Sequence, residues 1–363
     1  MAGPQPRSGL LNIKPHMIAV GSKGLAPVSI DLSSNESALG PSPRAVAAGR
    51  AAMASAERYH ENAARELAEA VAGRYGLDAG RIAVGHGSDD LLARLARAFL
   101  EPGSELIHSR NGYLKFPNYA HANDARPVAA ADIALRADVD GILACLTGRT
   151  RAIFIANPDN PSGSYLSAAE IRRLHAALPD NILLVLDSAY ADYVRAADYE
   201  PAERLVEEAS NVVATRTFSK IFGLAGMRLG WLYGPPAVVD AVRRIGLTFP
   251  ISSPGAAAGL AALADRAHAD MVFALNAEAK AAFGDRLRRL GLHVAASETN
   301  FVLVRFDDPA RPAAAAWKYL RSLGIATRRF ASPAYNDYVR ITLGLERELA
   351  RTADALADFL DPA

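Results

Sequence analysis

The sequence predicts an α/β fold in which a mostly parallel central sheet is flanked by helices and followed by a smaller α+β region. Short apolar segments alternate with helical patterns between residues 81 and 233, which favours a parallel sheet covered on both faces. Residues 182–186 are entirely apolar before Asp187, as expected of a strand buried on both faces. After about residue 255 the chain becomes alanine-rich and helical, with two later strand patterns. We therefore expect an N-terminal arm at 1–40, a large domain at 41–255 and a small domain at 256–363.

Composition excludes several classes of protein. The 363 residues carry a net charge of +1 and are 50% hydrophobic, enough for two domains and without the basic surface that nucleic acid requires. Cys145 is the single cysteine, which excludes an internal disulfide framework and fits a reducing compartment. Residues 1–8 lack the apolar segment of a signal peptide, and we find no apolar run of bilayer length. We expect a cytoplasmic protein with no nucleic-acid or membrane partner.

The first elements are two helices after a mixed segment of about 30 residues that contains several prolines. Ser42 and Pro43 predict a helix start, with serine as the N-cap and proline at the first helical position. A second helix is expected over residues 63–75, where apolar residues recur at helical spacing.

Residues 81–99 predict a strand, a glycine turn and an amphipathic helix. Gly85 and Gly87 allow a tight turn, and Ser88 is expected to cap the helix. Free backbone N–H groups at such a helix start bind anions, most naturally a phosphate. A plain cap with acidic residues in the first turn is the alternative. A dinucleotide-binding fingerprint is excluded because Asp90 stands where a third glycine is needed.

Three polar residues follow the predicted strands that come next. Asn160, Asp187 and Lys220 each lie just past a strand end, where ligands bind in parallel sheets. We expect them to converge although they are far apart in sequence. The expected elements are strands at 105–108, 151–156, 182–186, 211–214 and 227–233, a helix at 167–178, an alanine-rich helix at 254–290, a strand at 300–306, a helix at 312–323, a strand at 339–342 and a closing helix.

Lys220 has surroundings that suit imine formation. It lies between the hydroxyl residues Thr217 and Ser219 and a glycine-punctuated turn, and Arg228 follows eight positions later. A lysine attacks carbonyl groups when its amine is neutral, and a nearby cation lowers its pKa. The alternative is a solvated lysine in a glycine-rich loop.

Asp187 completes a set of groups that matches pyridoxal 5'-phosphate. A carboxylate at a buried strand end is costly unless it is paired, and a protonated ring nitrogen is a suitable partner. Asp187 would then hold that nitrogen and Lys220 would form the imine, with the phosphate at the helix terminus. Asn160 and Tyr190 can donate to the ring oxygen O3', and Tyr113 can stack on the ring. Lys220 would serve as the general base.

On these residues the sequence resembles the fold-type I pyridoxal-phosphate aminotransferases, and within them the histidinol-phosphate aminotransferase branch. The resemblance covers residues 32–344. Each motif is weak alone, but all of them in order and at similar spacing are a strong signal. The motifs are Ser34–Pro43, Arg58-Tyr59, Gly85–Asp89, Asn157–Gly163, Asp187–Tyr190, Thr217–Arg228 and Val339–Thr342.

The resemblance implies roles for individual residues. Lys220, Asp187 and Tyr190 would be catalytic. Arg340 would bind the α-carboxylate of the amino donor, or else form a surface ion pair. Tyr59 would reach the phosphate of a neighbouring subunit in a homodimer with shared active sites; ordinary packing is the alternative for Tyr59 and Tyr113. The implied cofactor-binding residues are Tyr59, Gly87, Ser88, Asp89, Tyr113, Asn160, Asp187, Tyr190, Thr217, Ser219, Lys220 and Arg228, and the substrate-binding residues are His16, Asn35, Arg328 and Arg340.

Departures from the family pattern fall on the substrate side. The sequence has Asn35-Glu-Ser-Ala38 for Asn-Glu-Asn-Pro, Asp159 for asparagine, Ser188 for glutamate and Pro15-His16 for Pro-Tyr. An amino acid in place of histidinol phosphate is therefore an alternative substrate.

The resemblance implies a transaminase that moves an amino group from a glutamate-like donor to a 2-oxo or acetol acceptor. A lyase, decarboxylase or cyclase of the same fold is an alternative, since threonine-phosphate decarboxylases have similar cofactor motifs. A non-catalytic domain that retains the cofactor is another. Metal hydrolases and serine hydrolases find little support, because the histidines show no ligand spacing and no G-x-S-x-G motif exists.

Overall fold

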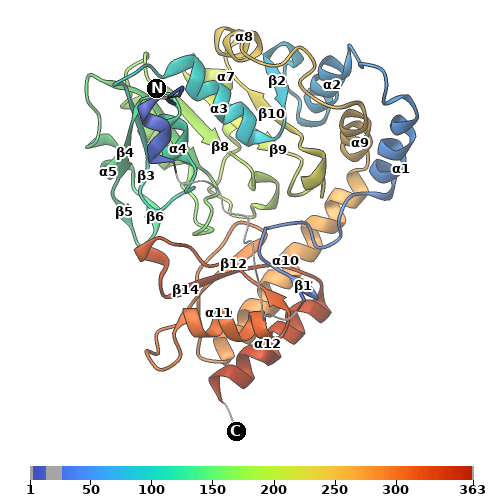
Figure 1. Cartoon of the computed structure of the whole chain (residues 1–363), viewed down its shortest axis with the longest axis vertical. Coiled ribbons are helices and arrows are strands. Elements are labelled where there is room, and N and C mark those ends of the chain that lie inside the picture. Colours follow the sequence, from blue (N-terminus) through green and yellow to red (C-terminus); the bar gives the residue numbers. More distant parts are fainter. Residues whose placement is uncertain (1–2, 14–26, 362–363) are drawn as a thin grey trace.

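The computed structural model describes residues 3–13 and 27–361 and contains a large sheet, a smaller sheet and the helices that cover them (Figure 1). The prediction for His16 lies outside the described residues. From β9 to β4 the strands of the large sheet run parallel, whereas β10 lies antiparallel to both of its neighbours. The expected mostly parallel sheet is confirmed. In spatial order its strands are β2 (Ile82–Gly85), β10 (Gly230–Tyr233), β9 (Val212–Thr217), β8 (Leu183–Asp187), β7 (Thr150–Ala156), β3 (Glu105–Ser109) and β4 (Arg126–Ala130).

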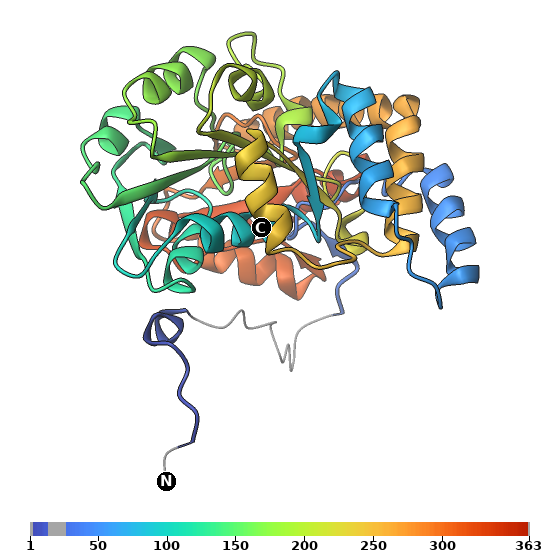
Figure 2. The same cartoon turned by 90° about the horizontal axis from the view of Figure 1, so that it is seen from above.

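Helices cover both faces of this sheet (Figure 2). Alternate residues of one strand enter different clusters: Ile153 and Ile155 pack on one face, and Ala152 and Phe154 on the other. Because neither face of the central strands meets water, β7 and β8 are mostly apolar. One face carries α2 (Ala63–Tyr75), α5 (Val139–Leu143), α6 (Ala168–Ala176), α7 (Ala202–Glu208) and α9 (Ser253–Ala264), and the other carries α3 (Ser88–Phe99), α4 (Phe116–His121) and α8 (Pro236–Arg244).

The C-terminal part forms a three-stranded antiparallel sheet with its own hydrophobic cluster. The strand β1 (Ile30–Asp31) pairs with β13 (Ile325–Ala326), so the segment after the N-terminal arm joins this part. The expected division at residue 255 stays a prediction; α9 and the first half of α10 contribute to the core cluster of the large sheet. The elements of the C-terminal part are β11 (His293–Val294), β12 (Phe301–Arg305), β14 (Tyr338–Thr342), α10 (Arg266–Arg289), α11 (Ala313–Ser322) and α12 (Glu346–Leu360).

Two expected boundaries are wrong. The alanine-rich stretch is two helices rather than one, because the chain leaves helical geometry at Asp265, whose side chain then accepts a hydrogen bond from the backbone N–H of His268 and caps α10. The strand expected over 227–233 begins only at Gly230, because residues 225–227 form a 3-10 turn. The remaining elements are α1 (Pro43–Ala52), the hairpin β5 (Asp132–Ile133) and β6 (Arg136–Ala137), and 3-10 turns at Ser8–Asn12, Met53–Ser55, Ala79–Arg81, Ala191–Tyr193, Ala225–Met227 and Pro333–Tyr335.

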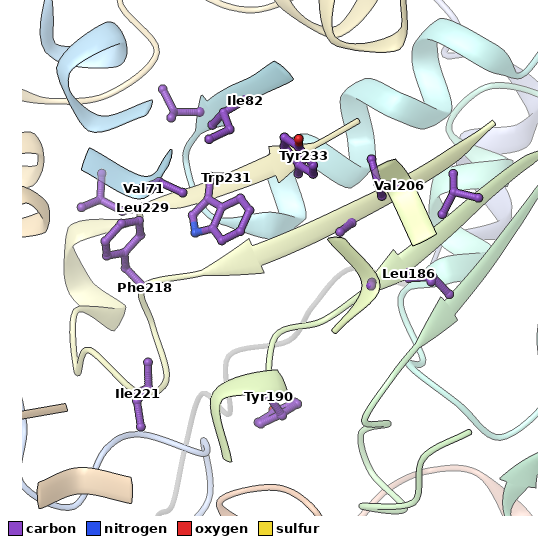
Figure 3. Packing of buried hydrophobic residues seen from close by; sticks show 14 of the residues in the cluster. Val71, Ile82, Leu186, Tyr190, Val206, Phe218, Ile221, Leu229, Trp231 and Tyr233 are labelled. Carbon is purple, nitrogen blue, oxygen red and sulfur yellow. The ribbon is translucent and has the colours of Figure 1, made fainter. Parts of the chain in front are cut away.

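The buried side chains of Phe218 and Trp231 lie next to each other at the start of the loop that follows β9 (Figure 3). Phe218 and Ile221 are buried in the core cluster of the large sheet on either side of Lys220 in sequence. Trp231 is 1% exposed and its ring lies 5.3 Å from that of Tyr75. The backbone next to Lys220 is therefore held by buried neighbours. Among the described residues, no helix has both the length and the apolarity to cross a bilayer.

Ser42 connects the start of α1 to the junction of α9 and α10. Its Oγ accepts a hydrogen bond from the backbone N–H of Arg44 at 3.1 Å, so the predicted N-cap is confirmed. The same hydroxyl donates to Asp265 Oδ2 at 2.6 Å. One buried side chain thus serves two helix starts.

We expect Ser42→Ala to lower the free energy of unfolding by about 1–2 kcal/mol, because the substitution removes a helix cap and a partner of Asp265. Denaturant unfolding measures this change. Ser55→Ala is the matched control, since Ser55 is exposed and its hydroxyl makes only a long contact within its own turn. Equal stability of the two variants would contradict the double role of Ser42.

Candidate active site

A cavity of about 290 Å³ lies past the carboxyl ends of β7, β8 and β9. Its volume is close to the lower end of the range for small-molecule pockets, about 300–1,000 Å³. Because these strands are parallel neighbours, their ends deliver residues distant in sequence to one place. The predicted residues on its wall are Ser88, Asp89, Tyr113, Asn160, Asp187, Tyr190, Thr217, Ser219, Lys220 and Arg228. Ser34, Glu36, Ala156, Pro158, Ala189 and Ala225 complete it.

Lys220 presents a half-buried amine to this cavity. Its Nζ donates to the backbone carbonyl of Asn35 at 3.0 Å and to that of Ser34 at 3.4 Å. Burial, with added repulsion from the guanidinium of Arg340, lowers the pKa of Lys220 to about 8. A substantial fraction of the amine is therefore neutral near pH 8, which nucleophilic attack on a carbonyl requires.

Asp187 ends β8 with a carboxyl group that is 6% exposed. Thr215, on the neighbouring strand β9, donates from its hydroxyl to Asp187 Oδ1 at 2.9 Å. Burial raises the pKa of Asp187 to about 7, and the hydrogen bond from Thr215 opposes this rise. A buried carboxyl group of this kind favours a cationic partner in the cavity.

The turn before α3 approaches Arg228 through backbone alone. Gly87 has φ +82°, and a Cβ at this position would lie 2.6 Å from the guanidinium of Arg228. The expected cap by Ser88 is wrong: Gly87 is the N-cap, no side chain caps the helix, and Ser88 is the first helical residue and lines the cavity. Backbone N–H groups of α3, the Ser219 hydroxyl and Arg228 together suit an anion.

Asp89 fixes the aromatic wall of the cavity. It accepts hydrogen bonds from the hydroxyls of Tyr113 at 2.9 Å and Tyr119 at 2.8 Å, and from Lys115 Nζ at 2.9 Å. Burial opposes ionisation of Asp89, but the Lys115 ammonium and these hydrogen bonds hold its pKa below the usual value. Tyr113 is thereby oriented on the cavity wall, and this role of the Asp89 side chain was not predicted.

Arg340 lies on β14 and reaches across to the residues of the large sheet. It is 5% exposed, and its guanidinium donates to Asn160 Oδ1 and to the backbone carbonyl of Ser33, both at 2.6 Å. Burial lowers the pKa of Arg340 to about 10, and its Nε has no hydrogen-bond partner among the described residues. These bonds differ from the surface ion pair that was the alternative for Arg340.

Three further predicted residues lie away from the cavity wall. Asn35 is 1% exposed, and its side chain bonds Tyr190 and Thr342. Arg328 is exposed and pairs through its backbone with Arg340. Tyr59 is 77% exposed, and its ring stacks on Phe249 at 4.1 Å.

Sequence reasoning missed several residues that support the site. Thr215 could have been found from strand alternation, because it lies two residues before Thr217 and so on the same face of β9. Glu36 lies within the motif Ser34–Pro43 but was given no role, although it lines the cavity. Asn300 gave no signal in the sequence, because it reaches the site through contacts with a distant segment: its Nδ2 donates to the carbonyls of Asn35 at 3.0 Å and Glu36 at 3.2 Å.

The pair formed by Thr215 and Asp187 predicts a pH-dependent effect of Thr215→Val. The folded pKa of Asp187, about 7, lies above its unfolded value of about 3.9, so its contribution to stability is lost as the pH rises through 7. Without the hydroxyl the carboxylate is unpaired. We expect losses of about 1 kcal/mol at pH 5 and about 2 kcal/mol at pH 8, measured by denaturant unfolding of the free chain.

Thr352→Val is the control for this experiment. Thr352 is fully buried, and its hydroxyl donates to a backbone carbonyl rather than to a carboxylate. Its loss of stability should be the same at both pH values. A pH-independent loss for Thr215→Val would contradict the charge dependence.

Comparisons with known proteins identify the family of this chain. The histidinol-phosphate aminotransferase of Rhodospirillum centenum is 48% identical over 363 residues, covering 99% of both chains, and that of Paramagnetospirillum magneticum is 43% identical with the same coverage. The crystal structure of the Sinorhizobium meliloti histidinol-phosphate aminotransferase in complex with pyridoxal-5'-phosphate superposes with a TM-score of 0.90 at 31% identity, covering 99% of this chain and 98% of that one. The family model for aminotransferase class I and II matches residues 27–356, and the chain belongs to that family.

Proposed function

We propose that this chain is a pyridoxal-phosphate-dependent aminotransferase that moves an amino group between a glutamate-like donor and a 2-oxo or acetol acceptor. The observation that carries the proposal is the Lys220 amine, whose pKa is about 8, in the same cavity as the buried Asp187. Membership of the aminotransferase family supports amino transfer over the lyase and the non-catalytic alternatives.

The residues present fit pyridoxal phosphate. The backbone approach at Gly87, with Ser88, Ser219 and Arg228, suits the phosphate. Asp187 suits the ring nitrogen and Tyr113 the ring face. When bound, the cofactor supplies an electron sink for negative charge that develops at the substrate carbon.

The side chains around it would bind, orient and move protons. Lys220 would take a proton from the substrate Cα and return it, because its amine is neutral and basic near pH 8. Asp187 would keep the ring nitrogen protonated by sharing its hydrogen bond. Tyr190 and Asn160 would donate hydrogen bonds to the ring oxygen.

Arg340 would bind the α-carboxylate of the glutamate-like donor. Its planar guanidinium suits bidentate contact with a carboxylate, and burial strengthens such a contact by excluding water. Arg328, beside it on the antiparallel bridge, supplies a second positive charge. The two arginines suit an anionic substrate.

We propose histidinol phosphate as the amine substrate. Three relatives named histidinol-phosphate aminotransferase are 42–48% identical over nearly the full chain, which supports this choice. The departures at Ser37, Ala38, Asp159 and Ser188 keep another amino acid as the alternative substrate.

We further propose a homodimer with shared active sites, in the cytoplasm. The exposed Tyr59 supports the first point, because its ring, stacked on Phe249, lies outside its own cavity wall and at the surface, where a neighbouring subunit can contact it. The division into an arm, a large domain and a small domain is also retained as a proposal.

Two half-reactions test the proposed function. The purified chain is incubated with pyridoxal phosphate, histidinol phosphate and 2-oxoglutarate, and glutamate formation is measured. We expect turnover that Lys220→Ala reduces by at least about 10³-fold, since both attachment and proton transfer are lost. If amino acids are converted but histidinol phosphate is not, the proposed substrate is wrong. Failure of glutamate and every amino acid tested would overturn amino transfer.

Gly87→Ala tests the anion site. The added methyl group would meet Arg228 and would occupy a left-handed backbone position. We expect the dissociation constant of pyridoxal phosphate to rise by about tenfold or more, measured by absorbance titration of the free chain. Gly226→Ala is the matched control, since it lies in the same region with open space around it and has no positive φ. Equal affinities would contradict the anion site.

A further inference from the structure

We infer that Asn35 is a positioning residue, whose side-chain amide directs the Tyr190 hydroxyl proton into the cavity and whose backbone carbonyl aims the Lys220 lone pair there. The inference deepens the proposed function and rests on it. It replaces the expected substrate contact of Asn35 with an action through two other residues.

The polar atoms of Asn35 all have partners. Its backbone N–H donates to Thr342 Oγ1 at 3.0 Å, and its Oδ1 accepts from the same hydroxyl at 3.2 Å. Its Nδ2 donates to Tyr190 Oη at 2.8 Å. Its carbonyl accepts from Lys220 at 3.0 Å and from Asn300 at 3.0 Å. Being 1% exposed, it has little capacity left for a substrate.

Asn35 is held in this place from both parts of the molecule. Thr342 on β14 and Asn300 just before β12 fix it from the C-terminal sheet, and Tyr190 and Lys220 contact it from the large sheet. Its φ of 56° is left-handed, a conformation that asparagine adopts more readily than most residues. An asparagine at position 35 therefore suits both the left-handed backbone and the side-chain hydrogen bonds.

The bond to Tyr190 has a directional consequence. The phenol oxygen accepts the Asn35 N–H, so its own single proton must point elsewhere. Tyr190 is 4% exposed and lines the cavity, and an acceptor there would receive that proton. Burial raises the pKa of Tyr190 to about 12, so the phenol keeps its proton. Asn35 thus makes Tyr190 a donor toward the cavity.

The bond to Lys220 has a similar consequence. A neutral lysine amine has two N–H groups and one lone pair. The hydrogen bonds to Asn35 and Ser34 point both N–H groups at the loop. The lone pair is then directed away from the loop, toward the cavity that Lys220 lines. Asn300 helps to hold the accepting carbonyl in place.

The test is a double-mutant cycle between Asn35→Gly and Tyr190→Phe. Glycine keeps the left-handed backbone and the backbone hydrogen bonds, and it removes the side-chain bonds to Tyr190 and Thr342. The dissociation constant of pyridoxal phosphate is measured by titration, with the unfolding of the free chain as a second readout. Asn35→Gly alone should raise the dissociation constant about three- to tenfold, the value of one neutral hydrogen bond. The effect of Tyr190→Phe should shrink by a similar factor when Asn35 is already glycine.

Asn35→Asp separates the effect of the hydrogen bond that Asn35 donates to Tyr190 from the effect of the shape of its side chain. Aspartate has nearly the same shape and tolerates the same backbone, but its carboxylate would accept the Tyr190 proton and draw it out of the cavity. We expect this variant to bind the cofactor more weakly than Asn35→Gly. Asn181→Asp, at an exposed turn, is the control for the added charge and should match the unchanged protein.

Three results decide the inference. Weaker binding by Asn35→Asp than by Asn35→Gly, with coupling to Tyr190, supports it. The inference would be overturned if the two single substitutions changed the dissociation constant independently, so that their factors multiply in the double variant. It would also be overturned if Asn35→Asp weakened binding less than Asn35→Gly. Failure of the unchanged chain to bind pyridoxal phosphate would overturn the proposed function instead, and the unfolding cycle of the free chain would still report whether Asn35 and Tyr190 are coupled.

Discussion

The site depends on one constraint: the amine of Lys220 is half-buried, and its hydrogen bonds go to backbone carbonyls rather than to a carboxylate. A lysine in such a place loses part of the hydration that favours its charged form, and its pKa falls. The loop can hold the amine there because Phe218 and Ile221 fix the backbone in the core. Gly223, at φ +65°, then lets the chain pass close to Gly40, where a Cβ would be 2.4 Å from backbone.

The parallel sheet supplies Asp187, which lies at the carboxyl end of β8. Asp187 and Thr215 lie on neighbouring parallel strands, and their register brings hydroxyl and carboxyl together. Burial favours the protonated form of Asp187, whereas the Thr215 hydroxyl favours the ionised one. Together the two effects leave a carboxyl group that can share a hydrogen bond with a cationic ring nitrogen. Packing around Asp187, and not its residue type alone, sets the balance between its protonated and ionised forms.

The C-terminal sheet contributes hydrogen bonds that support the residues around the cavity. Arg340 and Thr342 alternate with the apolar Val339 and Ile341 along β14, so both lie on the same face of that strand. Arg340 reaches Asn160, and Thr342 reaches Asn35. Residues of the large sheet and of the C-terminal sheet therefore meet around one cavity, and the buried Asn35 is hydrogen-bonded to both parts.

The sequence by itself determined the sheet class, most strands of the large sheet and the polar residues at strand ends. Those features follow from local patterns: apolar runs, glycine turns and polar residues after strands. The motif residues from Gly87 to Arg228 are visible in the same way.

Tertiary structure alone decided three further matters. Gly87 rather than Ser88 caps α3, because the turn next to the guanidinium of Arg228 needs a backbone position with φ +82°, which glycine adopts most readily. The alanine-rich stretch divides at Asp265, because a cap shared with Ser42 stabilises the break. Asn35 lies behind the residues that line the cavity and bonds to them, and its side-chain and backbone partners come from segments 155 to 307 residues away. No local pattern encodes contacts at that separation.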